Sequence, residues 1–389
     1  MNASLPPTTV RREIVGIDII RFLCAFSVVL AHFLPPLSGN YAWAKYGGAG
    51  VDIFFVISGF IIPQSSEGRS PFAFIQSRVV RLVPGVWICA TITLVFLLLA
   101  GESLLSVWGK YIRSMLFVPI MPGDVANLGA IWIDGAYWTL FVEIAFYGLI
   151  LLLLLFNAFR HISVVATALG TISLVYWVAL FGSRLLYPDE HFTQVLFDTG
   201  FKRYLDLSLV HHGAWFGLGI NIWLLTRTKL RKRLLSILVC LAGGMLQEAH
   251  HAMFSLIDAS VVPGLLYDVV GLGLILLAIF SPLAQGYSEN VRRICRWVGL
   301  TTYPLYLVHD RAGHIALAAL AGSLLPSREA ATWVIIPAAI LLAFVIARFL
   351  EPRLQKSFKG VFEAIKPVLQ NRNEQHILLK KTGAFVGSS

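Results

Sequence analysis

The chain has 389 residues, of which 57% are hydrophobic and only 13% are charged, and its mean hydropathy is +0.75. Soluble domains carry about 25% charged residues, so this composition excludes an ordinary soluble domain and predicts an all-α, polytopic membrane protein. The formal net charge of +10 does not indicate nucleic acid. Basic loops that face anionic lipid explain such an excess in a membrane protein.

Ten apolar stretches are predicted to cross the membrane as helices. They are residues 14–34, 46–63, 84–101, 137–158, 162–182, 206–225, 234–254, 263–283, 297–322 and 331–350. The second is short, and the seventh and ninth carry several ionisable side chains. We therefore expect these three to line protein or water rather than lipid.

The distribution of Lys and Arg predicts that both termini are cytoplasmic. With the N-terminus inside, the inner segments hold fourteen of these residues and the outer loops hold seven. This bias follows the positive-inside rule, and an even number of spans returns the chain to the same side. We predict a membrane domain at residues 1–356 and a basic cytoplasmic tail at 357–389.

The first predicted span carries three ionisable side chains, whose cost in hydrocarbon indicates that they face a polar cavity. Arg21 and His32 are eleven residues apart, which puts them on nearly the same helix face at about 16 Å along the axis. Asp18 lies three residues before Arg21 on that face and can pair with it. On spacing alone, interfacial anchoring and a structural histidine are the alternative interpretation.

Two further acidic residues begin predicted spans at their outer ends. Glu143 has three candidate roles, which are to orient His32, to bind a sugar hydroxyl or to cap its helix, where negative charge is favoured. Asp52 has the same ambiguity. His309, in the polar ninth span, is a candidate for the acceptor path, with structural pairing as the alternative.

The long outer loops, residues 102–136 and 183–205, are rich in aromatic and acidic side chains. These are Trp108, Tyr111, Asp124, Trp132, Asp134, Asp189, Glu190, His191 and Asp198. Such an outer mouth suits a hydroxylated acceptor such as a sugar. An interfacial aromatic belt explains the Trp and Tyr residues equally well.

No motif indicates a metal or a resident cofactor. The pairs His211–His212 and His250–His251 are neighbours whose side chains point about 100° apart on a helix, so neither pair makes a chelating site alone. No Walker or Rossmann glycine loop is present. Ser58 lacks the strand–turn–helix setting of a nucleophile elbow, which argues against a serine hydrolase.

Six short motifs occur in order along the chain. They are Gly16-Ile17-Asp18-Ile19-Ile20-Arg21 with His32, Gly50 to Phe60 (GVDIFFVISGF), Arg78-Val79-Val80-Arg81-Leu82-Val83-Pro84, Trp138 to Glu143 with Phe146-Tyr147, Tyr303 to His309, and Glu351-Pro352. Together they resemble the acyltransferase-3 family of multi-spanning membrane O-acyltransferases, and within it the branch that acetylates exopolysaccharide. The resemblance covers about residues 13–356. The chain departs from the family at Thr302, where Ser is usual, and at Val83 and Gly85, where aromatic residues are common.

The resemblance implies that cytosolic acetyl-CoA is the acyl donor. The implied acceptor is a hydroxyl of an extracytoplasmic or lipid-linked carbohydrate, such as exopolysaccharide or lipopolysaccharide. Arg78 and Arg81 share a helix face at the inner side. The planar guanidinium group of arginine can bind phosphate with two hydrogen bonds, so these two residues are expected to bind the donor. His32 is the candidate general base on the acceptor hydroxyl, because an imidazole takes up a proton near neutral pH. A covalent acyl-histidine relay is the second option.

The predicted site residues fall into three groups. They are the catalytic residues His32, Arg21 and Glu143, the donor-binding residues Arg78 and Arg81, and the substrate-binding residues Asp18, Asp52, Trp138, Tyr303 and His309. Acetyl-CoA acts as a substrate, and we predict no metal and no permanently bound cofactor. The expected partners are the carbohydrate acceptor, acyl-CoA, membrane lipid and polysaccharide-assembly proteins, without nucleic acid, at a bacterial inner membrane.

Two other functions are compatible with the sequence. A proton-coupled transporter also carries intramembrane Asp, Arg and His residues, although no paired halves of the kind common in carriers are present. Transfer of another acyl group, such as succinyl, or transfer to a small-molecule acceptor stays open, because pocket volume cannot be deduced from sequence.

Overall fold

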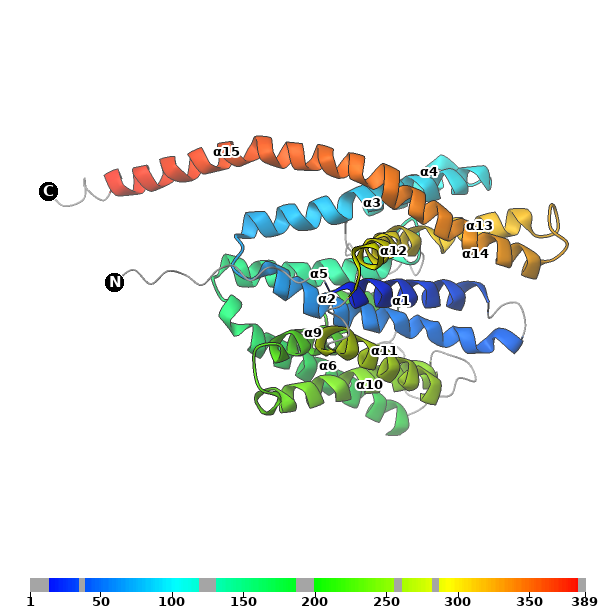
Figure 1. Ribbon diagram of the computed structural model, residues 1–389, viewed down its shortest axis with the longest axis horizontal. Helices are drawn as coiled ribbons and strands as arrows, with labels where there is room; N and C mark the ends of the chain where they lie inside the picture. The colour runs from blue at the N-terminus through cyan, green and yellow to red at the C-terminus, as the bar shows by residue number, and fades with distance from the viewer. Residues whose placement is uncertain are drawn as a thin grey trace.

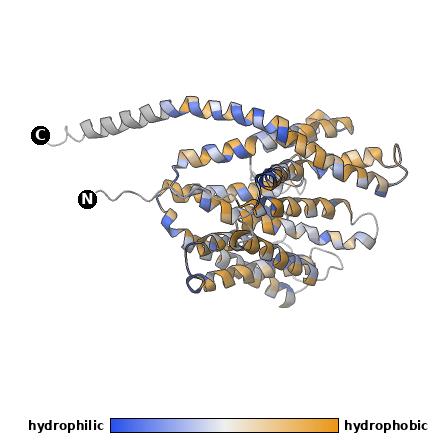
Figure 2. Cartoon of the chain, in the orientation of Figure 1, coloured by the Kyte–Doolittle hydropathy of each residue, from blue (hydrophilic) through white to orange (hydrophobic). Residues whose placement is uncertain are grey.

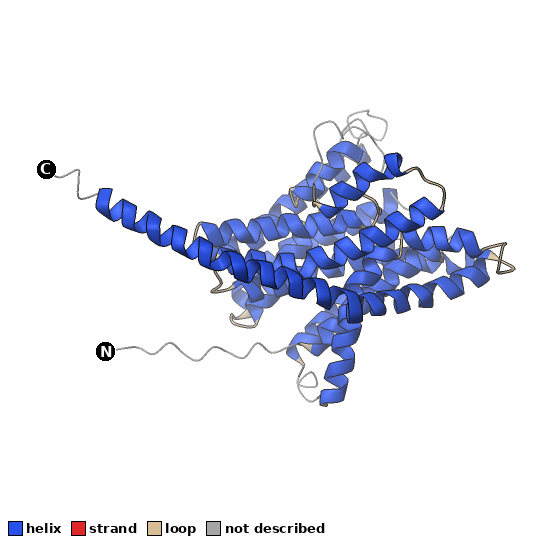
Figure 3. Ribbon diagram, turned by 90° about the horizontal axis from the view of Figure 1, so that it is seen from above, coloured by secondary structure: helices blue, strands red, loops and turns tan. Residues whose placement is uncertain are grey.

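The computed structural model describes residues 14–34, 39–118, 131–186, 199–254, 261–281 and 287–383. Within these ranges the regular structure is helical, apart from an isolated bridge between Ala321 and Leu325 (Figure 3). Seven helices are long and apolar enough to cross a membrane. The prediction of an all-helical, polytopic membrane protein is therefore confirmed.

The bundle is built from ten principal helices. They are α1 (Val15–Phe33), α2 (Gly50–Ser66), α3 (Pro71–Leu99), α5 (Tyr137–Leu155), α6 (Ile162–Leu186), α9 (Gly213–Leu225), α10 (Leu234–Phe254), α11 (Val261–Phe280), α12 (Glu289–Val308) and α14 (Arg328–Val345). The remaining described helices are η1 (Gly39–Ala49), α4 (Leu104–Met115), η3 (Phe159–His161), α8 (Thr199–Leu207), η4 (Leu230–Lys232), α13 (Arg311–Leu320), the π-helical η6 (Ile346–Leu350) and α15 (Glu351–Gly383). Figure 2 shows apolar residues over most of this bundle and more polar residues along α12 and α15.

The ninth predicted span, residues 297–322, is not one continuous helix, and this part of the prediction is wrong. The α-helix α12 ends at Val308, and α13 begins at Arg311. Asp310 stands immediately before α13, where the helix dipole favours a negative side chain. The break turns the polar residues around it into the bundle, so the segment forms a site instead of a plain crossing.

The predicted boundary at residue 356 falls inside α15. This helix follows α14 through the π-helical turn η6 and runs to Gly383. In Figure 1 its far end extends beyond the bundle. The tail proposed from sequence is therefore continuous with the last apolar helix rather than a separate segment.

Close helix packing places α2 at the centre of the bundle, between α1 and α9 (Figure 1). The contact with α9 depends on two glycines. A Cβ atom at Gly59 would lie 2.2 Å from the carbonyl oxygen of Phe216, and one at Gly219 would lie 2.1 Å from that of Val56. Small residues of this kind let two membrane helices approach to backbone contact.

We predict that Gly219→Ala destabilises the bundle by about 1–3 kcal/mol, because the added methyl group overlaps the backbone of α2. Gly148→Ala is the matched control, since a Cβ there meets no atom within 4 Å. Thermal unfolding of the detergent-solubilised proteins measures the difference. Equal stability of the Gly219 variant and the wild type would contradict the packing described here.

Candidate active site

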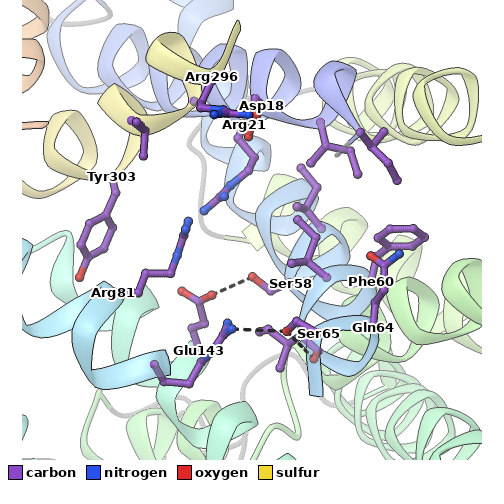
Figure 4. Close-up of a pocket in the computed structure, with 18 of the residues that line it drawn as sticks. Asp18, Arg21, Ser58, Phe60, Gln64, Ser65, Arg81, Glu143, Arg296 and Tyr303 are labelled. Atoms are coloured by element: carbon purple, nitrogen blue, oxygen red, sulfur yellow. Dashed lines mark hydrogen bonds between the residues drawn. The ribbon is translucent and has the colours of Figure 1, made fainter. Parts of the chain in front are cut away.

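A cavity of about 530 Å³ opens at one end of the bundle, between α1, α2, α3, α5, α12 and α15. The ends of α1, α2, α3 and α12 that form it are those predicted to face the cytoplasm, whereas α5 contributes Glu143, which was predicted to lie near the outer end of its span. Its ionisable lining residues are Asp18, Arg21, Arg78, Arg81, Glu143, Tyr147, Arg296, Tyr303 and Glu351. Figure 4 shows Arg21 and Arg81 directed into the same space. Four guanidinium groups around one cavity suit a ligand with several phosphates.

Local contacts hold the polar side chains of this inner cavity in place. Glu143 accepts hydrogen bonds of 2.9 Å from the hydroxyls of Ser58 and Tyr147. Arg78 donates to the Ser65 hydroxyl at 3.4 Å and lies over the Tyr147 ring at 5.5 Å. These contacts join α2, α3 and α5 around the cavity.

Glycines let the walls of the inner cavity come together. A Cβ at Gly85 would lie 2.4 Å from Glu351 Oε1 and 2.5 Å from the Tyr303 ring, and one at Gly299 would lie 2.6 Å from the Asp18 Cβ. The departure from the family pattern at Gly85 therefore has a structural reason. An aromatic residue there would displace Tyr303, whose hydroxyl donates to the carbonyl oxygen of Leu82.

A narrow second cavity of about 60 Å³ continues from the inner one. The two cavities share Arg21, Ser58, Glu143 and Tyr303. The narrow cavity extends along α5 and α12 as far as Thr139 and Tyr306, whose hydroxyls lie 3.0 Å apart. This cavity leads from the arginines towards the opposite end of α1, between mainly apolar side chains such as Phe54, Phe55 and Leu307.

At that opposite end, His32 and His309 form a hydrogen-bonded pair, with His32 Nδ1 3.0 Å from His309 Nε2. The carbonyl oxygen of Tyr306 lies 2.9 Å from His309 Nδ1 and only accepts, so His309 carries its proton on Nδ1. In neutral His309 the Nε2 atom is then the acceptor, and His32 must donate through Nδ1. His32 Nε2 is left unprotonated, which is the state that a general base requires.

Asp310 supplies the negative charge next to this pair. Its Oδ1 atom lies 3.8 Å from His32 Nδ1 and 3.3 Å from His314 Nδ1. A proton gained by His32 would therefore be stabilised by a carboxylate within ion-pair distance. Asp134 extends the network, because its Oδ2 atom accepts a 2.9 Å hydrogen bond from the backbone N–H of Arg311.

An outer pocket of about 270 Å³ is lined by Asp134, which contacts the backbone of Arg311, but not by His32 or His309. Its polar and aromatic lining residues are Trp132, Asp134, Trp138, Lys202, Arg203 and Asp206. A Cβ at Gly135, in the same wall, would lie 2.6 Å from Asp310 Oδ2. The predicted outer mouth is thus represented by Trp132 and Asp134. Trp108 and Tyr111 lie on α4 and do not line this pocket. The other candidates, Asp124, Asp189, Glu190, His191 and Asp198, lie outside the described residues.

The structure separates the predicted site residues into distinct places. The inner cavity contains Asp18, Arg21, Arg78, Arg81, Glu143 and Tyr303, the paired histidines are His32 and His309, and the outer pocket contains Trp138. Asp52 lines none of these three cavities. It is buried against Gln247, whose Nε2 donates to Asp52 Oδ1 at 3.1 Å.

Glu143 and the neighbours of His32 require corrections. Glu143 is the seventh residue of α5, so the capping role proposed from sequence is wrong. No contact between Glu143 and His32 occurs among the described side chains, and His309 and Asp310 occupy the positions next to His32. Sequence reasoning assigned no role to Asp310 or Tyr306. The available signal was their place in and directly after the motif Tyr303 to His309.

Fold and site together define a polytopic membrane protein with an arginine-lined inner cavity, a narrow continuation and a histidine pair at the opposite end of α1. Residues 14–350 match the family described as an acyltransferase domain. The match includes both cavities' principal residues and the histidine pair. The chain therefore belongs to the acyltransferase-3 family.

Three curated relatives agree with this family. The exopolysaccharide production protein ExoZ of Rhizobium meliloti is 40% identical over 106 residues, which cover 26% of this chain and 32% of the relative. The peptidoglycan O-acetyltransferase OatA of Listeria monocytogenes is 23% identical over 92% of this chain and 58% of its own length. A putative peptidoglycan O-acetyltransferase, YrhL of Bacillus subtilis, is 32% identical over 28% of this chain and 17% of the relative. The matches thus span less than two thirds of each relative, and no solved structure matches the chain significantly.

Asp134 precedes α5, outside the apolar spans, and should make stability depend on pH. Burial and the nearby Asp310 carboxylate raise its pKa from the ordinary 3.8 to about 7. The folded state therefore holds this proton more tightly than the unfolded chain. The free energy of unfolding should fall as the pH rises from about 4 to about 7, by up to a few kcal/mol, and then level off.

We predict that Asp134→Asn removes most of this fall. Chemical unfolding between pH 5 and pH 8 measures it, and Glu289→Gln, which removes an exposed carboxylate at the start of α12, is the control. An unchanged pH profile in the Asp134 variant would show that this carboxyl group is not responsible.

Proposed function

We propose that this chain transfers an acetyl group from cytosolic acetyl-CoA to a hydroxyl group of a carbohydrate at the extracytoplasmic side of a bacterial inner membrane. The observation that carries the proposal is the cavity system that runs from the arginines as far as Tyr306, whose ring lies 5.6 Å from that of His309 in the His32–His309 pair. The relatives' names support the same chemistry, because they refer to exopolysaccharide production and to peptidoglycan O-acetylation.

The donor would enter from the inner cavity. Its phosphates would pair with Arg21, Arg78, Arg81 and Arg296, all of which line that cavity. Along α1, Arg21 and His32 are about 16 Å apart, a separation that only an extended ligand can bridge. The pantetheine arm of CoA is the thin, extended part of the donor, which fits the narrow second cavity.

The reaction would take place at the outer end of this path. The acceptor hydroxyl gives its proton to His32 Nε2 while its oxygen attacks the thioester carbonyl carbon. The carbon–sulfur bond breaks, the acyl group stays on the acceptor oxygen, and CoA leaves as a thiolate that takes up a proton. His309 is a positioning residue that sets the tautomer of His32, and Asp310 stabilises the imidazolium formed during transfer.

The acceptor would approach through the outer pocket. Trp132 and Trp138 offer apolar ring faces, and Asp134 and Asp206 offer acceptors for hydroxyl groups. This combination suits a sugar, which has apolar ring faces and polar edges. A proton-coupled transporter is disfavoured by membership of an acyltransferase family. Another acyl group in place of acetyl remains the second candidate.

We predict that Arg81→Ala weakens binding of CoA by about tenfold to one-hundredfold, because a charged hydrogen bond contributes about 1.5–3 kcal/mol. Arg348→Ala is the matched control, since Arg348 packs over Trp297 at 5.1 Å and lines neither cavity. Titration calorimetry of the solubilised proteins with CoA measures the change. Equal affinities of the two variants for CoA would show that the donor does not bind at Arg81.

We predict that His32→Ala and Arg21→Ala abolish acyl transfer while the proteins still insert and fold. Loss of a general base typically lowers the rate by about 10²–10⁴-fold. Transfer of labelled acetyl from acetyl-CoA measures this in purified protein, and His161→Ala, in η3, is the histidine control. Wild-type turnover by both variants would exclude the site on α1.

Mass spectrometry of the surface glycan, with and without the gene, identifies the acyl increment.

A further inference from the structure

Three acidic side chains from different helices meet inside the bundle, outside all three cavities described above. They are Asp52 of α2, Glu248 of α10 and Asp268 of α11, and one carboxylate oxygen from each lies within 4.8 Å of the others. Their side chains are almost completely enclosed, with residue exposures of 6%, 4% and 0%. Carboxylates this close inside a protein repel one another strongly unless a positive charge or protons neutralise them.

The surrounding basic residues can neutralise at most one of the three carboxylates. Among the described residues, the basic side chain within ion-pair distance is His212, whose Nδ1 atom lies 3.7 Å from Asp52 Oδ1. Both carboxylate oxygens of Asp268 are buried and have no hydrogen-bond partner. An orphaned buried carboxylate is costly, so Asp268 requires either a proton or a bound cation in this fully enclosed position.

Gln247 provides a separate indication of a ligand. Its Nε2 atom donates to Asp52 Oδ1 at 3.1 Å and lies 3.0 Å from His212 Nδ1. With the amide reversed, its oxygen would face Asp52 Oδ1, so the orientation with Nε2 towards an ionised Asp52 is favoured. In this orientation Gln247 Oε1 is buried without a donor, at a residue exposure of 7%. Gln247 precedes Glu248 in α10 and contacts Asp52, so its unpartnered carbonyl oxygen is a candidate cation ligand.

We propose that Asp52, Glu248, Asp268 and Gln247 form a binding site for a divalent, oxygen-preferring cation, with Ca²⁺ as the assigned ion. The four side chains offer oxygen atoms alone, which disfavours zinc. Ca²⁺ accepts irregular arrays of six to eight oxygens and bidentate carboxylates, whereas Mg²⁺ retains several waters, for which a fully enclosed cluster is unsuited.

The site connects helices that are distant in sequence. Asp52 begins α2, Glu248 lies near the end of α10, and Asp268 lies in the first half of α11, so by the predicted topology the site is in the outer half of the membrane. The lack of a side chain at Gly264 leaves room for Glu248, since a Cβ there would lie 2.0 Å from its Oε1 atom. The bound cation ties α10 and α11 to α2, which carries Ser58 of the inner cavity.

The sequence predicted no metal, because its histidine pairs lack chelating spacing. The proposed ligands are carboxylates and an amide that come together only in the fold. Asp52, which was predicted to bind substrate, receives a structural role instead.

The test uses the full-length, detergent-solubilised protein, treated with EDTA, reloaded with CaCl₂ and desalted. Elemental mass spectrometry should find about one Ca²⁺ per chain, and millimolar CaCl₂ should raise the unfolding temperature by several degrees relative to EDTA. Asp268→Asn and Glu248→Gln should each weaken the calcium affinity by about tenfold or more, because the charge of the ligand set determines affinity. The two substitutions are independent, so one is informative if the other fails to fold.

The matched control is Glu351→Gln. Glu351 is also buried and has an orphaned oxygen, but it lies in the inner cavity. This variant should retain the calcium content and the thermal shift of the wild type. Absence of bound calcium and of a thermal shift in the wild type would overturn the proposal and indicate that protons neutralise the cluster. Wild-type calcium affinity in a folded Asp268 or Glu248 variant would overturn it as well.

Discussion

The cost of placing ionisable groups inside a bundle of apolar helices governs this structure. A charge removed from water must be paired, hydrogen-bonded or opened to an aqueous cavity. The inner arginines meet this requirement around a cavity of about 530 Å³, together with Glu143 and Glu351. The outer pair, His32 and His309, is stabilised by the backbone carbonyl oxygen of Tyr306, close to His309, and by the carboxylate of Asp310, close to His32. The polar groups thus occupy a few defined places, and the remaining helix surfaces stay apolar.

One helix links the two ends of the candidate reaction path. Arg21 and His32 are both on α1, and the narrow cavity beside α5 and α12 leads from the first towards the second. A helix holds such a separation rigidly, so reactants from opposite sides of a membrane can meet without a large movement of the chain. This arrangement suits an acyl transfer in which the donor and the acceptor arrive from different compartments.

The residues around α2 show how one motif can serve three purposes. Within the segment Gly50 to Phe60, Ser58 contacts Glu143 in the inner cavity, whereas Asp52 contacts Gln247 on the opposite side of the bundle. Gly59, directly after Ser58 in the chain, allows the close approach of α9. A single helix therefore supports the candidate donor site, the packing of the bundle and the proposed cation site.

Composition and periodicity were sufficient to predict an all-helical membrane protein, because hydrophobic length and charge bias are local properties of the chain. The eleven-residue spacing of Arg21 and His32 likewise predicted a shared face on α1. The partner of His32 could not be predicted, since His309 is 277 positions away and becomes a neighbour only where α12 ends. The same reason applies to Asp52, whose contact with Gln247 spans 195 positions. Local patterns determine which residues are costly to bury, and only tertiary packing decides which of them meet.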